Sequence, residues 1–301
     1  MALHWLQKRM REVLAESKVS LLRFGFPSFG RRIGKSLQVK NLSKVTGAAI
    51  ESVKINAIRP ELRGNRLKWV KRRRLGSSLL ALGANAFFFL VGARIHLWIR
   101  LKKWQSWEVA CFRLLYGRAH LAVPEGRRTV CVDEIPGKSL DDYADQGILT
   151  TREIEAAGRE LSRAHGLWCE ELHGYWSHGD PHLDNIIYDS RTDRARLIDF
   201  EVIHSKSLSA LERHADDLFV FLQHLMGLTT REQWIPFALA FISAYDRPMV
   251  TEKLRERLNM TNNWGAAIWW NLRTDYLLRT EIIERVGALN RALKPRRCLC
   301  A

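Results

Sequence analysis

A polar octapeptide followed by a strand-turn-strand pattern constrains the fold of this 301-residue chain more than any other feature. The octapeptide runs from His178 to Asn185 (HGDPHLDN). Two short apolar runs, Ile186–Tyr188 and Arg196–Ile198, follow it on either side of a polar turn, and they predict a β-hairpin. The hairpin would bring Asp199 back beside Asn185. The sequence thus predicts a polar loop next to a hairpin that returns a carboxylate to it.

Three side chains of this pattern suit phosphoryl transfer. Asp180 and Asn185 are five positions apart, so a loop can offer a carboxylate to an acceptor hydroxyl and an amide oxygen to Mg²⁺. Asp199 would add a second metal ligand, since Mg²⁺ prefers oxygen donors. The alternative is that these are ordinary turn and strand-end residues. Their agreement with the surrounding pattern favours all three as catalytic residues, with Asn185 and Asp199 holding the metal.

Together with Leu197–Glu201, the octapeptide resembles the protein-kinase-like superfamily, in particular aminoglycoside phosphotransferases, RIO-type kinases and bacterial lipopolysaccharide core (Kdo) kinases. Gly179 stands where protein kinases carry Arg, and Glu201 stands where they carry the Gly of Asp-Phe-Gly. Both departures favour a small-molecule or glycolipid kinase. The resemblance implies an α+β, bilobal protein-kinase-like fold with a small β-rich N-lobe and a helical C-lobe. It also implies ATP and Mg²⁺ as cofactors.

Two further parts of such a site lie earlier in the chain. Lys71, in the alternating segment Lys68–Lys71, resembles the lysine that holds the α- and β-phosphates of ATP, although it could be one more cation on a basic surface. Glu108 begins a helix-like run that ends near Gly117. Its carboxylate would pair with Lys71, unless it is an exposed surface glutamate.

The sequence indicates less clearly which segments would bind the nucleotide base and cover its phosphates. Val130–Leu140 reads as a buried strand that breaks at Pro-Gly, which suits a hinge between two lobes. In the family this segment meets adenine through backbone groups, so the resemblance places Asp133, Glu134 and Ile135 there. Val45–Ala49 is the nearest small-residue turn to a glycine-rich loop, and it lacks the repeated-glycine pattern.

We expect three parts along the chain: a basic N-terminal extension (1–40), an N-lobe (41–135) and a helical C-lobe (136–301). The C-lobe pattern predicts helices over residues 151–169, 209–227 and 231–244.

Positive charge is concentrated in the first third. The chain carries a formal charge of +16. Residues 1–110 contain 23 Lys and Arg against 5 Asp and Glu, which gives +18 and leaves −2 for the rest. Such a field attracts phosphate-rich partners such as an anionic membrane surface, phosphorylated lipopolysaccharide or nucleic acid. We expect a membrane or glycolipid rather than nucleic acid, and a solvated basic face is the alternative.

An uncharged run of 19 residues, Leu75–Ala93, lies between clusters of arginines. It resembles a membrane-contacting segment, but a single crossing would separate Lys71 from Asp180 across the bilayer. We therefore interpret residues 75–107 as an interfacial insertion in the N-lobe, with Trp98, Trp104 and Trp107 in the headgroup zone. The alternative is a core layer of the small lobe, because most apolar stripes are core.

The first 40 residues lack the pattern of a secretory signal, and the five cysteines lack paired metal-ligand spacing. We expect a cytoplasmic protein, peripheral at the inner membrane. The sequence favours a kinase that phosphorylates a hydroxyl of a sugar or glycolipid. Two alternatives stay open, a RIO-like serine/threonine protein kinase and a membrane-associated pseudokinase scaffold.

Overall fold

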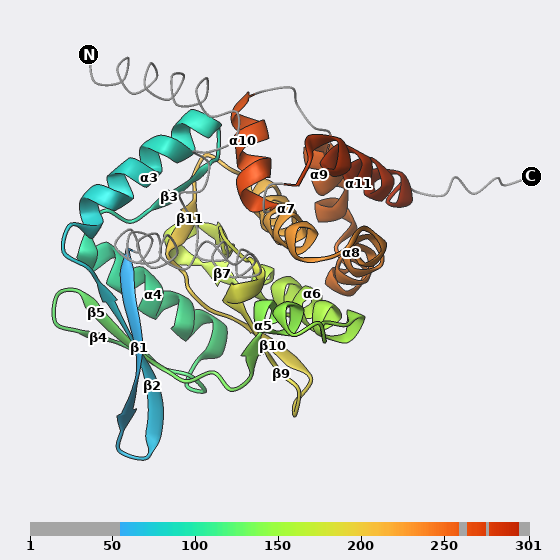
Figure 1. Cartoon of the computed structure of the whole chain (residues 1–301). Helices are drawn as coiled ribbons and strands as arrows, with labels where there is room; N and C mark the ends of the chain where they lie inside the picture. The colour runs from blue at the N-terminus through green and yellow to red at the C-terminus, as the bar shows by residue number, and fades with distance from the viewer. Residues whose placement is uncertain (1–54, 259–263, 275–276, 295–301) are drawn as a thin grey trace, which may run out of the picture. The chain divides into compact units, whose positions relative to one another are not determined.

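The computed structural model describes residues 55–258, 264–274 and 277–294. Within them the chain forms a small lobe around an antiparallel sheet, followed by a larger helical lobe (Figure 1). The predicted α+β organisation, a small β-rich lobe followed by a helical lobe, is therefore confirmed. The basic extension 1–40 and the small-residue turn 45–49 lie outside the described residues.

The sheet of the small lobe has four antiparallel strands in the order β1-β2-β5-β4. They are β1 (Asn56–Arg63), β2 (Arg66–Arg73), β4 (Ala122–Glu125) and β5 (Thr129–Asp133). Alternate side chains of a strand point to opposite faces. Lys71 and Arg73 of β2 are accordingly buried together, while Arg72 between them is exposed.

Two helices and a short strand connect β2 to β4. They are α3 (Ser77–Val91), β3 (Ile95–Leu97) and α4 (Leu101–Tyr116). Asn85 of α3 ties the helix to β3, because its side chain exchanges hydrogen bonds of 2.7 and 3.0 Å with the backbone of Leu97. β3 also pairs with β11 (Val202–His204), which follows Glu201 in the chain. The connection between β2 and β4 is thus fixed to the segment that follows Asp199 and Glu201.

The predicted start of the helix that carries Glu108 is wrong by seven residues, because α4 begins at Leu101. Its buried residues recur every three or four positions, and Lys102 and Lys103 occupy the exposed face between them. These two lysines are the solvent-facing side of an amphipathic helix.

The interfacial position predicted for Trp104 and Trp107 is also wrong. Their side chains are only 0% and 2% exposed, and Trp107 belongs to the main hydrophobic core. Trp98 is partly buried and packs against that core. The alternative interpretation, a core layer of the small lobe, therefore holds for this part of the 75–107 segment.

The large lobe is mainly helical. Its helices are α5 (Leu140–Asp145), α6 (Thr151–His165), α7 (Ala210–Leu228), α8 (Arg231–Tyr245), α9 (Pro248–Leu258), α10 (Trp264–Arg273) and α11 (Arg279–Ala292). Its short strands, besides β11, are β6 (Lys138–Ser139), β7 (Trp168–Cys169), β8 (Gly174–Tyr175), β9 (Ile186–Asp189) and β10 (Arg194–Leu197). The predicted helix over 151–169 ends early, since β7 begins at Trp168.

Capping boxes explain why the other helix predictions were close. Thr150 with Glu153, Ser209 with Glu212, and Thr230 with Gln233 each satisfy free N–H groups at the start of α6, α7 and α8. A capping box is a local signal, so it can be read from the sequence.

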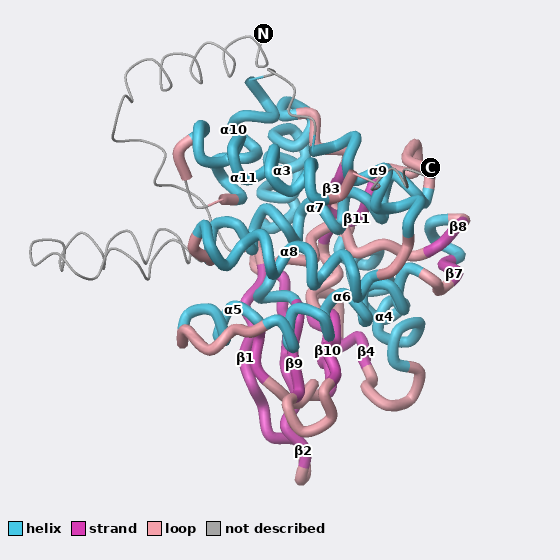
Figure 2. Tube along the Cα trace, turned by 90° about the vertical axis from the view of Figure 1, so that its right-hand side faces the viewer, coloured by secondary structure: helices cyan, strands magenta, loops and turns pink. Residues whose placement is uncertain are grey.

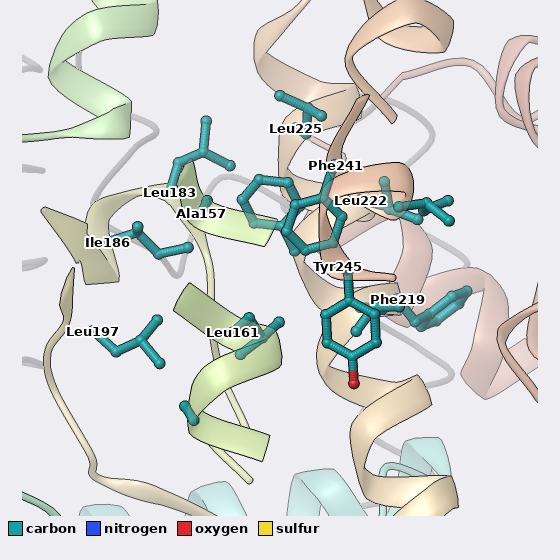
Figure 3. Close-up of a cluster of buried hydrophobic side chains, with 14 of the residues drawn as sticks. Ala157, Leu161, Leu183, Ile186, Leu197, Phe219, Leu222, Leu225, Phe241 and Tyr245 are labelled. Atoms are coloured by element: carbon teal, nitrogen blue, oxygen red, sulfur yellow. The ribbon is translucent and has the colours of Figure 1, made fainter. Parts of the chain in front are cut away.

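The core of the large lobe lies between α6, α7, α8 and the β9–β10 hairpin. Figure 3 shows Leu161 of α6 and Leu197 of β10 on one side and Phe241 of α8 on the other. Figure 2 shows the same elements side by side from a second direction. The ring of Phe221 stacks on that of Phe241 at 3.9 Å. Each fully buried side chain of this size contributes about 2–3 kcal/mol of transfer free energy.

Gly137 marks the connection between the lobes. Its φ is 127°, and a Cβ atom there would lie 2.3 Å from the carbonyl oxygen of Tyr188. Only glycine fits this close approach. The predicted break at Pro136-Gly137 therefore has a physical cause, which is the packing of the connection against β9.

Candidate active site

A glycine and a short 3₁₀ helix shape the loop that carries Asp180. Gly179 has a φ of 88°, and a Cβ atom there would lie 2.9 Å from the carbonyl oxygen of Val202. An arginine at this position, as in protein kinases, would be strained. The 3₁₀ helix, Leu183–Asn185, turns the chain so that the side-chain Nδ2 of Asn185 donates to the carbonyl of Asp180 at 3.0 Å. The loop thus brings Asp180 and Asn185 together.

Asp217 of α7 holds this loop in place. Its carboxylate accepts hydrogen bonds from the backbone N–H groups of His178 and Gly179, both at 2.7 Å. It also meets the Nε2 atom of His165 at 2.9 Å. All of these groups are buried, so the interaction fixes the loop without help from solvent. His165 thus serves as a packing and hydrogen-bonding residue.

The β9–β10 hairpin delivers Asp199, as the strand pattern predicted. The backbone N–H of Ile198 donates to the carbonyl of Asn185 at 2.9 Å, which places Asp199 next to the loop. Asp199 has a φ of 63°, in the left-handed region. This conformation costs a residue other than glycine about 1 kcal/mol or more. It is maintained where the surrounding contacts over-determine it, and here the Asp199 carboxylate pairs with Lys71.

Lys71 joins the two lobes at the site. Its Nζ atom lies 3.3 Å from each carboxylate oxygen of Glu108 and forms an ion pair with Asp199. Glu201 lies 3.5 Å from the same nitrogen. Lys71 and Glu108 are almost fully buried. The structure therefore brings together Lys71 and Glu108 of the small lobe with Asp199 of the large lobe.

The protonation states in this cluster depend on one another. Burial alone would lower the pKa of Lys71, but the carboxylates of Asp199, Glu108 and Glu201 raise it above its usual value. Burial would raise the pKa of Asp199, and Lys71 lowers it. Burial and the neighbouring Asp199 carboxylate raise the pKa of Glu201 to about 7. Lys71 and Asp199 thus form the charged pair, and Glu201 is the group that titrates near neutral pH.

Arg73 and Asn56 belong to the site as well, although the sequence did not single them out. Arg73 is fully buried, with its guanidinium 4.9 Å above the ring of Trp104 and 3.7 Å from Glu201. The side-chain amide of Asn56 donates to Glu201. The available signal was the alternation along β2, which places Arg73 on the same face as Lys71.

Arg273 is a further residue of the site, and no sequence pattern indicated it. It lies at the end of α10 and forms an ion pair with Asp180. Its guanidinium also stacks over the ring of Trp269 at 4.6 Å. Burial would raise the pKa of Asp180, but Arg273 lowers it to about 2. Asp180 is therefore ionised throughout the physiological range.

The hinge residues Asp133, Glu134 and Ile135 lie where β5 leaves the small lobe. The backbone N–H of Asp133 donates to Leu121 at 2.8 Å, and that of Glu134 donates to Leu67 at 3.3 Å. The Asp133 carboxylate pairs with Lys68 at 2.7 Å. Two of the three N–H groups are thus used within the protein, and contact of this segment with adenine stays a prediction.

The donor set at Asp199 fits Mg²⁺ when phosphate and water complete its coordination. Within the described ranges, no group of three or more His, Cys, Asp or Glu is arranged to hold a metal ion. Mg²⁺ in phosphotransferases takes only one or two protein carboxylates plus phosphate and water. Asp199, the amide oxygen of Asn185 and the carboxylate of Glu201 meet that need. With two cations and three carboxylates, the cluster of Lys71, Arg73, Glu108, Asp199 and Glu201 has a net charge of −1 if all are ionised.

No protein-family model and no curated protein sequence matches the chain. Solved structures with a similar course of the chain include an ethanolamine kinase of Plasmodium vivax, with a TM-score of 0.44 and 10% identity over 80% of both chains. The bifunctional kinase-methyltransferase WbdD gives 0.38 and 18%, covering 73% of this chain and 47% of WbdD. Rv3197 of Mycobacterium tuberculosis, solved with erythromycin, gives 0.35 and 16%, covering 80% and 71%. Such low values carry no argument about activity.

Proposed function

We propose that the protein is an ATP- and Mg²⁺-dependent phosphotransferase that acts on a hydroxyl group of a sugar or glycolipid, similar to a lipopolysaccharide core, at the cytoplasmic face of a membrane. The observation that carries the proposal is the Lys71 cluster. One buried lysine links Glu108 of α4 to Asp199 beside the Asp180–Asn185 loop. This is the arrangement that positions ATP phosphates next to a metal and an acceptor.

Each residue then has a distinct role. Lys71 binds the α- and β-phosphates, and Glu108 orients Lys71. Asn185 and Asp199, with Glu201 beside them, would hold Mg²⁺, which when bound neutralises charge on the β- and γ-phosphate oxygens. The hinge residues Asp133 to Ile135 would contact adenine through their backbone. We expect Asp180 to accept a hydrogen bond from the acceptor hydroxyl.

The low pKa of Asp180 fits a positioning role. In the transfer, the bond between the γ-phosphorus and the bridging oxygen breaks, and a bond to the acceptor oxygen forms. The hydroxyl proton passes to Asp180. A carboxylate with a pKa of about 2 is a weak base, so it takes this proton late. Such behaviour suits a loose transition state in which the nucleophile needs alignment more than activation.

Arg273 supports an anionic acceptor. It places a positive charge against Asp180 on a helix of the large lobe, where an acceptor hydroxyl must approach. A phosphate or carboxylate group on the acceptor would compete with Asp180 for this guanidinium. A phosphorylated sugar or glycolipid meets that requirement, whereas a neutral alcohol does not.

The test is formation of ADP by purified protein with Mg²⁺ and ATP, with and without lipopolysaccharide core extract. We expect Asp180→Ala and Asp199→Asn each to lower acceptor-dependent turnover by about 10²–10⁴-fold. Asp184→Asn, in the same loop, is the matched control and should keep its turnover. Equal turnover in wild type and both variants would contradict the assignment. A folded wild-type protein without turnover or stabilisation by Mg²⁺ and ATP would favour the pseudokinase scaffold. Transfer to a serine or threonine of an added protein would favour the RIO-like alternative.

A further inference from the structure

The exposed face of α3 carries a continuous apolar stripe. Its members are spaced alternately by three and four positions: Leu79, Leu82, Ala86 and Phe89. Leu79, Leu82 and Phe89 are 74%, 54% and 81% exposed. At 100° per residue these positions fall on one side of the helix, just as a heptad seam does. We call this row the α3 stripe.

The fold does not need the α3 stripe, because the opposite side of the helix makes the internal contacts. Ala81, Phe88 and Val91 are buried on that side. Phe88 meets the ring of Trp269 edge to face, with the centroids 5.9 Å apart. A soluble surface rarely exposes a contiguous apolar row of this length without a partner.

Positive charge gathers at the N-terminal end of the α3 stripe. Residues 62–107 contain 11 Lys and Arg and no Asp or Glu. The Ser78 hydroxyl donates to the carbonyl of Ile99 at 2.9 Å, which puts the start of α3 beside the segment leading to Arg100, Lys102 and Lys103. These three side chains are exposed and make no ion pair with any residue that the structure describes.

A second group of cations lies at the same end. A hollow in the surface is lined by Ala57, Leu75 and four arginines, of which Arg72, Arg74 and Arg128 are at least partly exposed and Arg73 is buried in the site. Leu75 lies two residues before the start of α3, so the hollow is at the N-terminal end of that helix. The N-terminal end of a helix carries partial positive charge, and that adds to the field of the arginines.

We propose that the α3 stripe and these cations dock the protein on an anionic lipid bilayer, with α3 lying in the plane of the interface. Apolar side chains would enter the boundary of the acyl chains while the arginines and lysines meet lipid phosphates. The 15 residues of α3 span about 22 Å, which is too short to cross the hydrocarbon core. No helix among the described residues has the length and apolar character to cross a bilayer.

The charge pattern favours a bilayer over a second copy of the chain. A dimer formed through a heptad seam relies on charges of both signs beside it. Leu75–Ala93 carries no charge at all, and the residues around it are uniformly basic. An anionic surface neutralises that field, whereas a second copy would add to it.

The docking face is connected to the acceptor side of the site by one helix. α10 packs against α3 through Trp269 and Gly265, where a Cβ atom would lie 2.9 Å from the backbone of Val91 (Figure 1). The same helix ends at Arg273, which pairs with Asp180. This step rests on the proposed phosphotransferase activity. It implies that a lipid-anchored acceptor reaches Asp180 from the surface on which α3 lies.

The test is cosedimentation of the full-length protein with vesicles of phosphatidylglycerol and phosphatidylcholine, or of phosphatidylcholine alone. We expect binding to the anionic vesicles only, weakened by high salt. Leu79→Glu should weaken it by about tenfold or more. Leu62→Glu is the matched control, because Leu62 is also 74% exposed but lies on the β1–β2 hairpin, and it should bind as wild type does.

Three results would overturn the proposal. One is equal binding by wild type and Leu79→Glu. Another is equal loss in Leu79→Glu and Leu62→Glu. The third is a wild type that ignores vesicles while Leu79→Glu changes its mass in light scattering, since that would assign the α3 stripe to a second copy.

Docking and catalysis can fail separately. Asp180→Ala should bind anionic vesicles as wild type does, because it lies outside the docking face. Leu79→Glu should keep ADP formation with a water-soluble sugar phosphate and lose only the stimulation by an acceptor embedded in vesicles. If no variant, wild type included, forms ADP but the Leu79→Glu and Leu62→Glu difference persists, the docking face stands and the proposed activity fails.

Discussion

The loop 178–185 and the segment 75–107 show two ways in which sequence relates to structure. The loop is held partly by its own short-range hydrogen bonds, from His182 to Asp180 and from Asn185 to His182, both at 2.9 Å. Segment 75–107 also has internal hydrogen bonds, between Asn85 and Leu97 and between Ser78 and Ile99, but they do not determine which of its apolar side chains are buried. Its aromatic residues Trp104 and Trp107 are buried, while Leu79 and Phe89 are exposed. The chemistry of a polar loop is local, whereas the burial of an apolar side chain is decided by distant neighbours.

The largest expected effect tests whether the loop 178–185 depends on an anchor outside it. Asp217→Ala would leave the N–H groups of His178 and Gly179 and the ring of His165 without their buried acceptor. We expect the free energy of unfolding to fall by about 4–5 kcal/mol, measured by chemical denaturation. Asp184→Ala, in the loop itself, should change it by less than about 1 kcal/mol. Equal values for the two variants would show that the loop needs no anchor.

The next effect tests segment 75–107, in which Trp104 and Trp107 were wrongly predicted to lie at a membrane interface. Trp104 is fully buried beneath Lys71 and Arg73, so Trp104→Ala removes core contacts. We expect a loss of about 3–4 kcal/mol in the free energy of unfolding. Its indole N–H has no hydrogen-bond partner among the described residues, which keeps the loss from being larger.

Leu79→Ala is the comparison for Trp104→Ala, since Leu79 is 74% exposed. It should lie within about 0.5 kcal/mol of wild type. A small loss for Trp104→Ala together with a large one for Leu79→Ala would restore the interfacial interpretation of α4. The two substitutions thus separate the buried part of segment 75–107 from its exposed part.

Much of the fold and part of the site could be predicted from sequence for a physical reason. Asp180, Asn185 and Asp199 are polar groups at short spacing on a loop and a hairpin, and capping boxes start three of the large-lobe helices. The start of α4 was missed because a charged residue reads the same on a helix face and in a break. Arg273 was missed because it lies on a helix, 93 positions from Asp180, whose sequence carries no recognisable motif of the site.

The third prediction concerns Glu201, whose pKa of about 7 exceeds its usual 4.5. Between these pH values the unfolded chain releases this proton and the folded protein keeps it, so stability falls as pH rises through the window. Above pH 7 the full penalty remains. Glu201→Gln lacks this group, so its free energy of unfolding should exceed that of wild type by a margin that grows to about 2–3 kcal/mol. Denaturation at several pH values measures it.

Mg²⁺ supplies the control for Glu201. A bound cation favours the ionised carboxylate, so Mg²⁺ with ATP should stabilise wild type more than Glu201→Gln at pH values above 7. A difference between the two proteins that does not vary with pH would mean that Glu201 is not the group that titrates. In that case its role in the site would be structural, through the hydrogen bond from Asn56 and the pairs with Lys71 and Arg73.

The smallest expected effect tests the ion pair that Arg273 forms with Asp180. Arg273 lowers the pKa of Asp180 to about 2 by direct pairing. In Arg273→Gln this pKa should rise by about one unit, equivalent to about 1.4 kcal/mol. The acid limb of kcat/KM should therefore move to higher pH by the same amount, because protonated Asp180 cannot take the proton of the acceptor hydroxyl. At neutral pH Asp180 stays ionised, so kcat should change little.

Arg273→Lys separates the charge of this side chain from its shape. Lysine keeps a positive charge near Asp180 but loses the planar stack on Trp269 and the paired donors that suit an anionic group. The acid limb should then remain as in wild type, while the KM for a phosphorylated acceptor rises in both variants. If Arg273→Gln leaves the acid limb unmoved, Asp180 is held by its loop alone. The pKa of Asp180 would then be set by residues of the loop 178–185 itself, and α10 would serve only to pack against α3.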